Sequence, residues 1–265
     1  MKYPGRVIKA GEQDATLVRA LKRQLNLVLV AGSDPGLRLD PQDGNFGPRM
    51  KQTVKLFQAR HTDNEGRPLK VDGEVGALSW EALFGAASVK HAATASKALL
   101  ARALEIAAAA EARKVREEPK NSNRGTEVDE FLRRAGAPLG SAWCCAFVYW
   151  CLDEAAAQLG RANPMFRTAG CLRHWQSAEQ KGARRISAAA AKADPGLVQP
   201  GMIFIMDYGK GLGHTGLIEA VNGGLVTTIE GNTDASQGRE GGGVYRHVRK
   251  IANINKGYID YSPVA

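Results

Sequence analysis

The sequence predicts an α+β protein with two domains, a small helical one followed by a larger one in which helices precede strands. The length of 265 residues exceeds that of one ordinary small domain. Helix-like apolar spacing dominates the first third of the chain, whereas β-like runs and a hairpin signal occupy the last quarter. We place the first domain at residues 12–86, a linker at 87–96 and the second domain at 97–265.

Composition limits the classes of protein to which the chain can belong. Hydrophobic residues make up 44% and charged residues 24%, as in globular proteins with a packed core. No run reaches the ~18 apolar residues of a spanning helix, so we expect no stable membrane insertion. The net charge of +9 attracts polyanions, but the sequence holds no zinc-finger, basic-zipper or aromatic RNA-binding motif. We therefore expect no nucleic acid as partner.

Two similar motifs mark the first domain. The motif DGNFG at residues 43–47 recurs as DGEVG at residues 72–76. Each predicts a tight turn, in which the Asp side chain bonds its own backbone and Gly supplies a positive φ. Helical spacing precedes the first motif, lies between the two motifs and follows the second, at Leu17, Leu21 and Leu25, at Val54, Phe57 and Gln58, and at residues 78–84.

A linker and two helices are expected next. Residues 87–96 are small and polar without an apolar stripe, which indicates a linker. Residues 97–117 are rich in Ala, Leu, Glu, Arg and Lys, which favours a helix that is closed by Pro119. A short helix is then expected to begin at Thr126 or Glu127.

The run WCCAFV at residues 143–148 begins an apolar helix. Its inward face is formed by Phe147, Val148, Cys151, Leu152, Ala155 and Leu159. Cys144 therefore lies in the first turn, where unpaired N–H groups lower the pKa of a thiol and can bind a developing oxyanion. Cys145, the alternative nucleophile, points about 100° around the helix into the core.

The remaining cysteines, Cys151 and Cys171, are interpreted as core or incidental thiols. The four cysteines do not have the spacing of zinc ligands, and their clustering does not suit a disulfide framework. We therefore expect all of them to be free thiols.

Several β-like runs follow, at residues 202–206, 214–221, 225–230 and 257–260. The sequence NGG around Gly223 predicts a hairpin between the second and third runs. A hairpin centred on Gly223 places Glu230 opposite Gly216. It likewise places Asn232 opposite His214. Both polar side chains then reach the imidazole, unless a slip of one residue turns them to the other face.

A thiol becomes a good nucleophile when an imidazole accepts its proton, and His214 is the predicted acceptor. It lies in the motif GHTG, which opens a strand. Glu230 or Asn232 could fix the tautomer and orientation of the ring, which is the third role in a catalytic triad. The other histidines are interpreted as surface or packing residues: His61, His91, His174 and His247.

The first domain resembles the peptidoglycan-binding domain found at the ends of many cell-wall hydrolases. The residues that carry the resemblance are the two Asp-Gly motifs, VKLFQ at residues 54–58, and Ser79 with Trp80. The resemblance implies non-catalytic binding to bacterial wall polymer. The residues expected to contact that polymer are Asp43, Phe46, Asp72 and Trp80. A departure from the family is the insertion-like stretch at residues 31–41, and an unrelated small helical domain is the alternative.

Four motifs in order, at residues 143–148, 200–204, 213–218 and 229–232, resemble the cysteine, histidine-dependent amidohydrolase/peptidase (CHAP) family. The resemblance covers about residues 97–262. It implies a papain-like fold, with helices packed on an antiparallel sheet, and hydrolysis of amide bonds in peptidoglycan.

The resemblance also implies a role for each site residue. Cys144 would be the nucleophile, His214 the general base and Glu230 the group that orients the ring. Asn232 would support His214 or polarise the carbonyl, and Trp143 is expected beside the substrate. Some phage members bind calcium through acidic residues just ahead of the nucleophile. Residues 136–142 hold no acid, so we expect no metal and no other cofactor.

The working hypothesis is a monomeric, endolysin-like peptidoglycan hydrolase that cleaves an amide of the stem peptide. An N-acetylmuramoyl-L-alanine amidase and an endopeptidase use the same thiol chemistry, so the bond remains open. Residues 1–9 lack the apolar region of a secretory signal, so we expect synthesis in the cytoplasm and action on the wall after release or export. The alternatives are a secreted antibacterial toxin with the same activity, a non-catalytic wall-binding protein, and a cytosolic thiol amidase.

Overall fold

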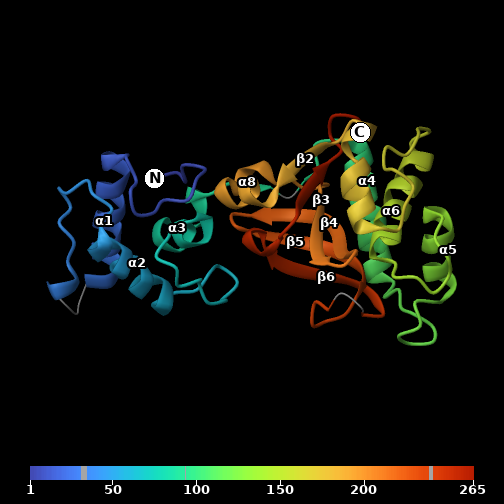
Figure 1. Ribbon diagram of the computed structural model, residues 1–265, viewed down its shortest axis with the longest axis horizontal. Helices are drawn as coiled ribbons and strands as arrows, with labels where there is room; N and C mark the ends of the chain where they lie inside the picture. Colours follow the sequence, from blue (N-terminus) through green and yellow to red (C-terminus); the bar gives the residue numbers. More distant parts are fainter. Residues whose placement is uncertain (31–34, 93, 239–240) are drawn as a thin grey trace. The chain divides into compact units, whose positions relative to one another are not determined.

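The computed structural model describes residues 1–30, 35–92, 94–238 and 241–265. The chain divides into two compact units, Met1–Lys90 with Lys192–Gly196, and His91–Ala191 with Leu197–Ala265. Helices make up the first unit, and the second combines helices with an antiparallel sheet (Figure 1). The predicted α+β class is confirmed. None of the helices in the described residues is both long enough and apolar enough to cross a membrane.

The first unit packs three helices around one apolar core. They are α1 (Ala15–Val30), α2 (Pro48–Arg60) and α3 (Ala77–Phe84), with 3-10 turns η1 (Pro35–Leu37) and η2 (Ala86–Ser88). The core includes the predicted helical positions, with Leu21, Leu25, Val54, Phe57 and Trp80 fully buried. Of the insertion-like stretch at residues 31–41, residues 31–34 lie outside the described part of the chain.

The two Asp-Gly motifs form the same turn. The carboxylate of Asp43 accepts the N–H of Asn45, and that of Asp72 accepts the N–H of Glu74, each at 3.0 Å. After each turn an apolar side chain enters the core, and a glycine in extended conformation caps the next helix: Phe46 and Gly47 before α2, and Val75 and Gly76 before α3. Each of the two Asp-Gly motifs therefore forms a turn that leads into a helix.

The glycines that follow Asp43 and Asp72 differ in their backbone conformation. Gly73 has the expected positive φ of 76°. Gly44 does not, and it is required for a different reason, because a Cβ there would lie 2.5 Å from the Cβ of Ala15 on α1. Close approach of the turn to a helix, rather than a left-handed backbone, explains this glycine.

The helices of the second unit are α4 (Ala98–Ala112), α5 (Thr126–Ala135), α6 (Cys144–Gln158) and α7 (Cys171–Ser177), with short 3-10 turns η3 (Glu179–Lys181) and η5 (Ile251–Asn253). The residues of α8 (Ala188–Ala193) and of the 3-10 turn η4 (Pro195–Leu197) are divided between the two units. The helix predicted to extend to residue 117 ends at Ala112. Lys114 adopts a left-handed backbone with φ of 55°, which stops the helix before Pro119. The predicted starts of α5 and α6 are confirmed.

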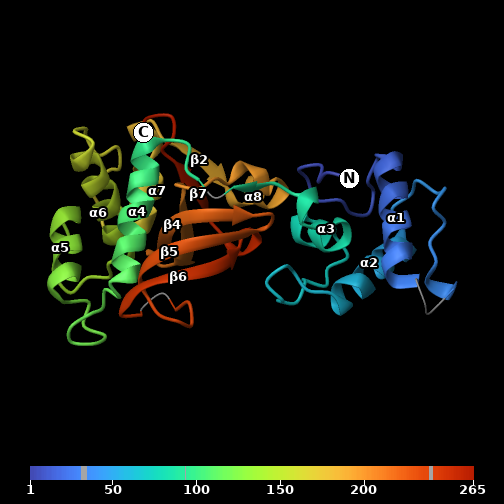
Figure 2. The same cartoon turned by 180° about the vertical axis from the view of Figure 1, so that it is seen from behind.

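The sheet contains β1 (His91–Ala92), β2 (Arg184–Ser187), β3 (Ile203–Gly209), β4 (Leu212–Asn222), β5 (Leu225–Thr233), β6 (Gly243–Lys250) and β7 (Gly257–Asp260). Its order is β2-β7-β3-β4-β5-β6, all antiparallel, and β1 pairs with β4. Figure 2 shows β4, β5 and β6 side by side. The four predicted β runs correspond to β3, β4, β5 and β7. The range predicted as a linker holds η2 and β1, so part of it belongs to the sheet.

The register of the β4–β5 hairpin decides which side chains meet. Next to the turn, Asn222 pairs with Leu225, one residue away from the predicted register. A bulge between Ile218 and Ala220 restores it, so that Leu217 pairs with Ile229 as predicted. The site end of the hairpin therefore has the predicted alignment, although the turn does not.

The sheet separates two apolar layers. α6 packs against β4 and β5, and α4 and α5 pack against α6, so the helices cover one face (Figure 1). The opposite face carries a second cluster that includes Phe204, Ile218, Val226 and Tyr258. This arrangement places the first turn of α6 over the adjacent strands β4 and β5.

Candidate active site

Cys144 is the first residue of α6 and is only 3% exposed. The indole of the preceding Trp143 donates a hydrogen bond of 2.8 Å to Glu117, which anchors the start of the helix. Gly231 of β5 lies against α6, and a Cβ at this position would lie 2.7 Å from the Cβ of Phe147. Lack of a side chain at Gly231 therefore lets the strand approach the helix that carries Cys144.

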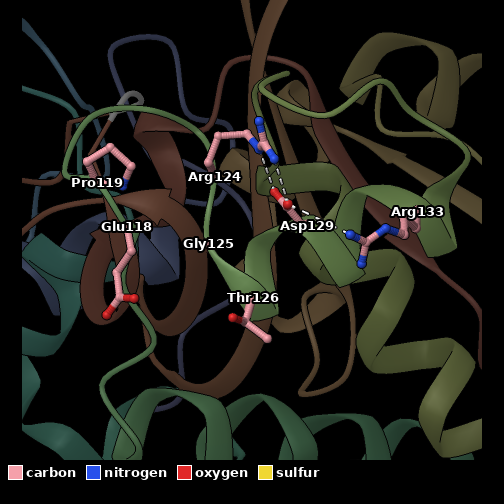
Figure 3. A pocket seen from close by; sticks show the side chains of 7 residues that line it. All are labelled: Glu118, Pro119, Arg124, Gly125, Thr126, Asp129 and Arg133. Atoms are coloured by element: carbon pink, nitrogen blue, oxygen red, sulfur yellow. Dashed lines mark hydrogen bonds and ion pairs between the residues drawn. The ribbon is translucent and has the colours of Figure 1, made fainter.

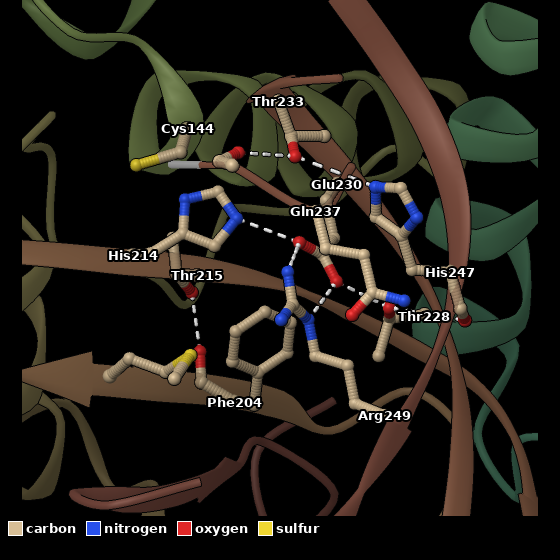
Figure 4. A network of polar contacts seen from close by, with 12 residues as sticks. Cys144, Phe204, His214, Thr215, Thr228, Glu230, Thr233, Gln237, His247 and Arg249 are labelled. Atoms are coloured by element: carbon tan, nitrogen blue, oxygen red, sulfur yellow. Dashed lines mark hydrogen bonds and ion pairs between the residues drawn. The ribbon is translucent and has the colours of Figure 1, made fainter. Parts of the chain in front are cut away.

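His214 of β4 and Glu230 of β5 form a buried pair. The imidazole Nε2 lies 2.7 Å from the Glu230 carboxylate, and both side chains are fully buried. A Cβ on Gly216 would lie 2.7 Å from the Cγ of Glu230, so this glycine makes room for the carboxylate to cross between the strands. The other ring nitrogen, Nδ1, has no hydrogen-bond partner among the described residues. Figure 4 shows the sulfur of Cys144 on that side of the ring.

The charges around the pair favour imidazolium and carboxylate. Burial opposes a charge on His214, but interaction with the Cys144 sulfur and with Glu230 raises its pKa to about 9. Burial likewise opposes ionisation of Glu230, but Arg249 and His214 lower its pKa to about 2. The ring is thus oriented and charge-stabilised through Nε2, and its Nδ1 lies on the side of the Cys144 sulfur.

The thiol of Cys144 departs from the sequence prediction. Its Sγ lies 3.5 Å from the Sγ of Cys171, the first residue of α7. Contact with Cys171 and burial raise the pKa of Cys144 well above its usual range, and His214 acts in the opposite direction. The lowered pKa that we expected at the start of the helix is therefore not found. Of these groups His214 is the one that favours the thiolate, so Cys144 ionises as an ion pair with the protonated ring.

Sequence reasoning missed two residues that hold Glu230. Arg249 of β6 donates two hydrogen bonds of 2.6 Å to the carboxylate, one to each oxygen (Figure 4). The hydroxyl of Thr228 donates a further bond to the same carboxylate. The strand β6 was not predicted, so the sequence offered no reason to place Arg249 beside Glu230.

Asn232 is close in sequence but is not joined to His214 by any hydrogen bond in the described part of the chain. Its backbone has a left-handed φ of 57°, and the β5–β6 register shifts between Glu230 and Thr233. The chain therefore leaves regular pairing before the position at which the hairpin would align Asn232 with the ring. The side-chain oxygen is buried and has no partner among the described residues.

The structure corrects the predicted contacts of three aromatic residues with substrate. Trp143 and Trp80 are fully buried and Phe46 is 2% exposed, so their rings belong to the two cores. Asp43 keeps an exposed carboxylate, which binds Lys22 at 2.6 Å. Asp72 accepts a hydrogen bond from the side chain of Gln58, in addition to its turn.

Two cavities are lined by residues of the second unit. One of about 770 Å³ is lined by Arg116, Glu117, Lys120, Asn121, residues 234–236, Gly241, Gly242 and Tyr245. Glu117 connects this cavity to the site, since one of its oxygens bonds Trp143 and the other is buried without a partner among the described residues. The second cavity, of about 420 Å³, borders the start of α5, where Arg124 and Arg133 both pair with Asp129 (Figure 3).

With this geometry in view, a comparison with protein families is decisive for the second unit. Residues 136–232 match the model of the CHAP domain. The chain carries a CHAP domain. Cys144, His214, Glu230 and Asn232 lie within the match, whereas Arg249 lies beyond it. Neither the search of curated proteins nor that of solved structures returned a match for this chain.

The CHAP domain assigns the chain to cysteine- and histidine-dependent hydrolases of the amidase or peptidase kind. The expected papain-like architecture agrees with the helices packed on an antiparallel sheet. The described residues contain no group of three or more His, Cys, Asp and Glu side chains placed to hold a metal ion.

Proposed function

We propose that this protein is a peptidoglycan hydrolase that cleaves an amide bond of the stem peptide. Cys144 is the nucleophile, His214 the general base and Glu230 the group that orients the ring. The observation that carries the proposal is the buried His214–Glu230 pair, which leaves Nδ1 free on the side of the Cys144 sulfur within a CHAP domain.

The geometry supports an acyl-enzyme route. The Cys144 proton passes to Nδ1 of His214, and the thiolate attacks the amide carbon. Backbone N–H groups in the first turn of α6 face the developing oxyanion. The imidazolium then gives its proton to the leaving amine, and water hydrolyses the thioester with the ring again as base. Glu230 keeps the ring in the tautomer that this sequence of proton transfers needs.

The first unit is proposed to hold the wall polymer. Its exposed cations would attract anionic wall polymers, and they include Lys2, Lys9, Arg38, Arg49, Lys51, Arg60 and Lys70. The repeated Asp-Gly turns support the resemblance to wall-binding domains. Binding through this unit would raise the local concentration of bonds available to the second unit. Release or export of a cytoplasmic product, as in an endolysin, would bring the enzyme to its substrate, and a secreted antibacterial toxin is the alternative.

Digestion of purified sacculi tests the activity. We expect wild type and Cys145→Ala to release soluble fragments and Cys144→Ala to release none. Mass spectrometry of the fragments identifies the bond, because an amidase frees a lactyl group and an endopeptidase frees an amino terminus within the peptide. Loss of activity in Cys145→Ala but not in Cys144→Ala would overturn the assignment of the nucleophile. Binding without any products over hours would favour a non-catalytic wall-binding protein.

Sedimentation with sacculi tests the first unit separately. Full-length Cys144→Ala should sediment with the wall, and further replacement of Lys51 and Arg60 by Glu should reduce the bound fraction and its salt sensitivity. Replacement of Lys181, an exposed lysine of the second unit, by Glu is the matched control. Equal binding by all of these variants would contradict wall capture by the charged surface of the first unit.

A further inference from the structure

A second thiol lies against the proposed nucleophile, and the catalytic route does not use it. The Sγ atoms of Cys144 and Cys171 are 3.5 Å apart, and both side chains are buried. All four cysteines are free thiols. Cys145 donates to the carbonyl of Thr168 at 3.6 Å and also interacts with Cys171, and Cys151 is fully buried on α6.

Packing of the backbone holds Cys171 in this position. A Cβ on Gly213 would lie 2.9 Å from the Cβ of Cys171, so the glycine before His214 allows α7 to lie directly on β4. One turn further along α7, His174 is fully buried and its Nε2 lies 2.9 Å from the hydroxyl of Tyr261. The close strand and the buried histidine fix the start of α7, and with it the sulfur of Cys171, beside Cys144.

We propose that Cys144 and Cys171 are a site of reversible covalent modification, in which a disulfide between them switches the hydrolase off under oxidation by hydroperoxides. This inference rests on the proposed function in one respect, the role of Cys144 as nucleophile. Closing the bond requires the two sulfurs to approach from 3.5 Å to about 2.05 Å. Rotation of the two short side chains covers such a distance without separating α6 from α7.

The chemistry balances with a hydroperoxide as the oxidant. The Cys144 thiolate attacks the terminal oxygen of the hydroperoxide, the O–O bond breaks, and an alcohol leaves with the proton, which gives a sulfenic acid at Cys144. The sulfur of Cys171 then attacks the sulfur of Cys144. The S–S bond forms, the S–O bond breaks, and hydroxide leaves with the Cys171 proton as water. Two thiols lose two electrons, and the hydroperoxide is reduced by two.

Cys171 also protects the nucleophile. A sulfenic acid with no neighbouring thiol is oxidised further to sulfinic acid, which thiol reductants do not reverse. A thiol already in contact intercepts the sulfenic acid and converts the damage into a disulfide that dithiothreitol reopens. Recovery of activity after reduction is therefore expected for a protein that contains Cys171 and not for one that lacks it.

The test treats the reduced full-length protein with hydrogen peroxide and measures free thiols, mass and sacculus hydrolysis. Tryptic peptides show whether Cys171 is cross-linked, because it lies between Arg167 and Arg173, whereas Cys144, Cys145 and Cys151 share the peptide between Arg134 and Arg161. The single variants then show which of these three cysteines is its partner. The variants are Cys144→Ala, Cys145→Ala, Cys171→Ala and, as matched control for a buried thiol away from the pair, Cys151→Ala. Each activity is compared with that of the same variant before oxidation.

We expect wild type, Cys145→Ala and Cys151→Ala to lose two thiols and about 2 Da, to yield one cross-linked peptide pair, and to recover on reduction. The hydrolase activity of wild type and of these two variants should fall at least tenfold and return with dithiothreitol. Cys171→Ala should gain oxygen at Cys144 instead and fail to recover. A cross-link in Cys144→Ala, or full recovery of Cys171→Ala, would overturn the proposal. Thiol counts and masses do not depend on hydrolysis, so a protein that forms the disulfide but cleaves no wall refutes only the proposed function.

Discussion

Arg249 binds both oxygens of Glu230 with its guanidinium, through two hydrogen bonds of 2.6 Å each. Paired donors of this kind fix the plane of a carboxylate as well as its charge. One of the two oxygens also faces Nε2 of His214 at 2.7 Å. The orientation of the imidazole therefore depends on a strand that lies outside the recognised CHAP segment.

Replacing Arg249 by Met should destabilise the protein and lower its activity. The change leaves a fully buried carboxylate without its main cation, and breaking such a buried pair costs about 3–5 kcal/mol. Arg246→Met on the same strand is the matched control, because Arg246 pairs with Glu219 and Glu111 at the surface and should cost at most about 1 kcal/mol. Chemical denaturation and sacculus hydrolysis measure both effects. Equal losses in the two variants would show that Glu230 does not depend on Arg249.

Replacing Glu230 by Gln should lower the pKa of His214 from about 9. The carboxylate favours the imidazolium, so a neutral amide lets the ring lose its proton at lower pH. The comparison is best made in a Cys144→Ala background, because the Cys144 sulfur also raises the pKa of His214. Titration of the ring by NMR gives the value directly. If the pKa stays the same in Cys144→Ala with and without Glu230→Gln, the carboxylate does not control the ring.

The local motifs predicted the proposed nucleophile and base, because Cys144 lies at the start of α6 and His214 near the start of β4. The order of cysteine at a helix start and histidine at a strand start is readable from the chain. The pairing of His214 with Glu230 was predicted through a hairpin whose turn is one residue out. A bulge that nothing in the sequence marks restored the register.

The residues that the sequence did not reveal are those whose role depends on contacts between distant segments. Cys171 resembles any buried thiol until α7 is placed on β4, and Arg249 resembles a surface cation until β6 is paired with β5. For the aromatic residues of the motifs, the sequence predicted contact with a ligand that their burial does not allow. Trp80 and Trp143 belong to family-like motifs because they hold the cores, and they have no exposed surface for a ligand.

Replacing Cys171 by Ala should make the Cys144 thiol more reactive at neutral pH. Contact with Cys171 is the largest cause of the raised pKa of Cys144, so its removal lowers that pKa and increases the thiolate fraction. The rate of alkylation by iodoacetamide at Cys144, located by fragmentation of the tryptic peptide, measures the change. Cys151→Ala should leave this rate unaltered, since Cys151 is not among the groups that shift the pKa of Cys144. A slower alkylation in Cys171→Ala would mean that the second sulfur assists ionisation instead.

The buried pair should give the folded protein a window of maximal stability between about pH 4.5 and 6.5. The pKa of Glu230 falls from 4.5 to about 2 on folding, so its contribution is complete above pH 4.5 and is lost as the pH falls toward 2. The pKa of His214 rises from 6.5 to about 9, so its contribution is complete below pH 6.5 and is lost as the pH rises through 9. Each limb of the stability profile corresponds to roughly 3 kcal/mol at most, and the two contributions do not add because they share one interaction.

Urea denaturation across pH 3–10 gives this stability profile, and Glu230→Gln should flatten its acid limb, because the group that titrates there is gone. An acid limb of unchanged depth in that variant would assign the loss of stability to other carboxylates.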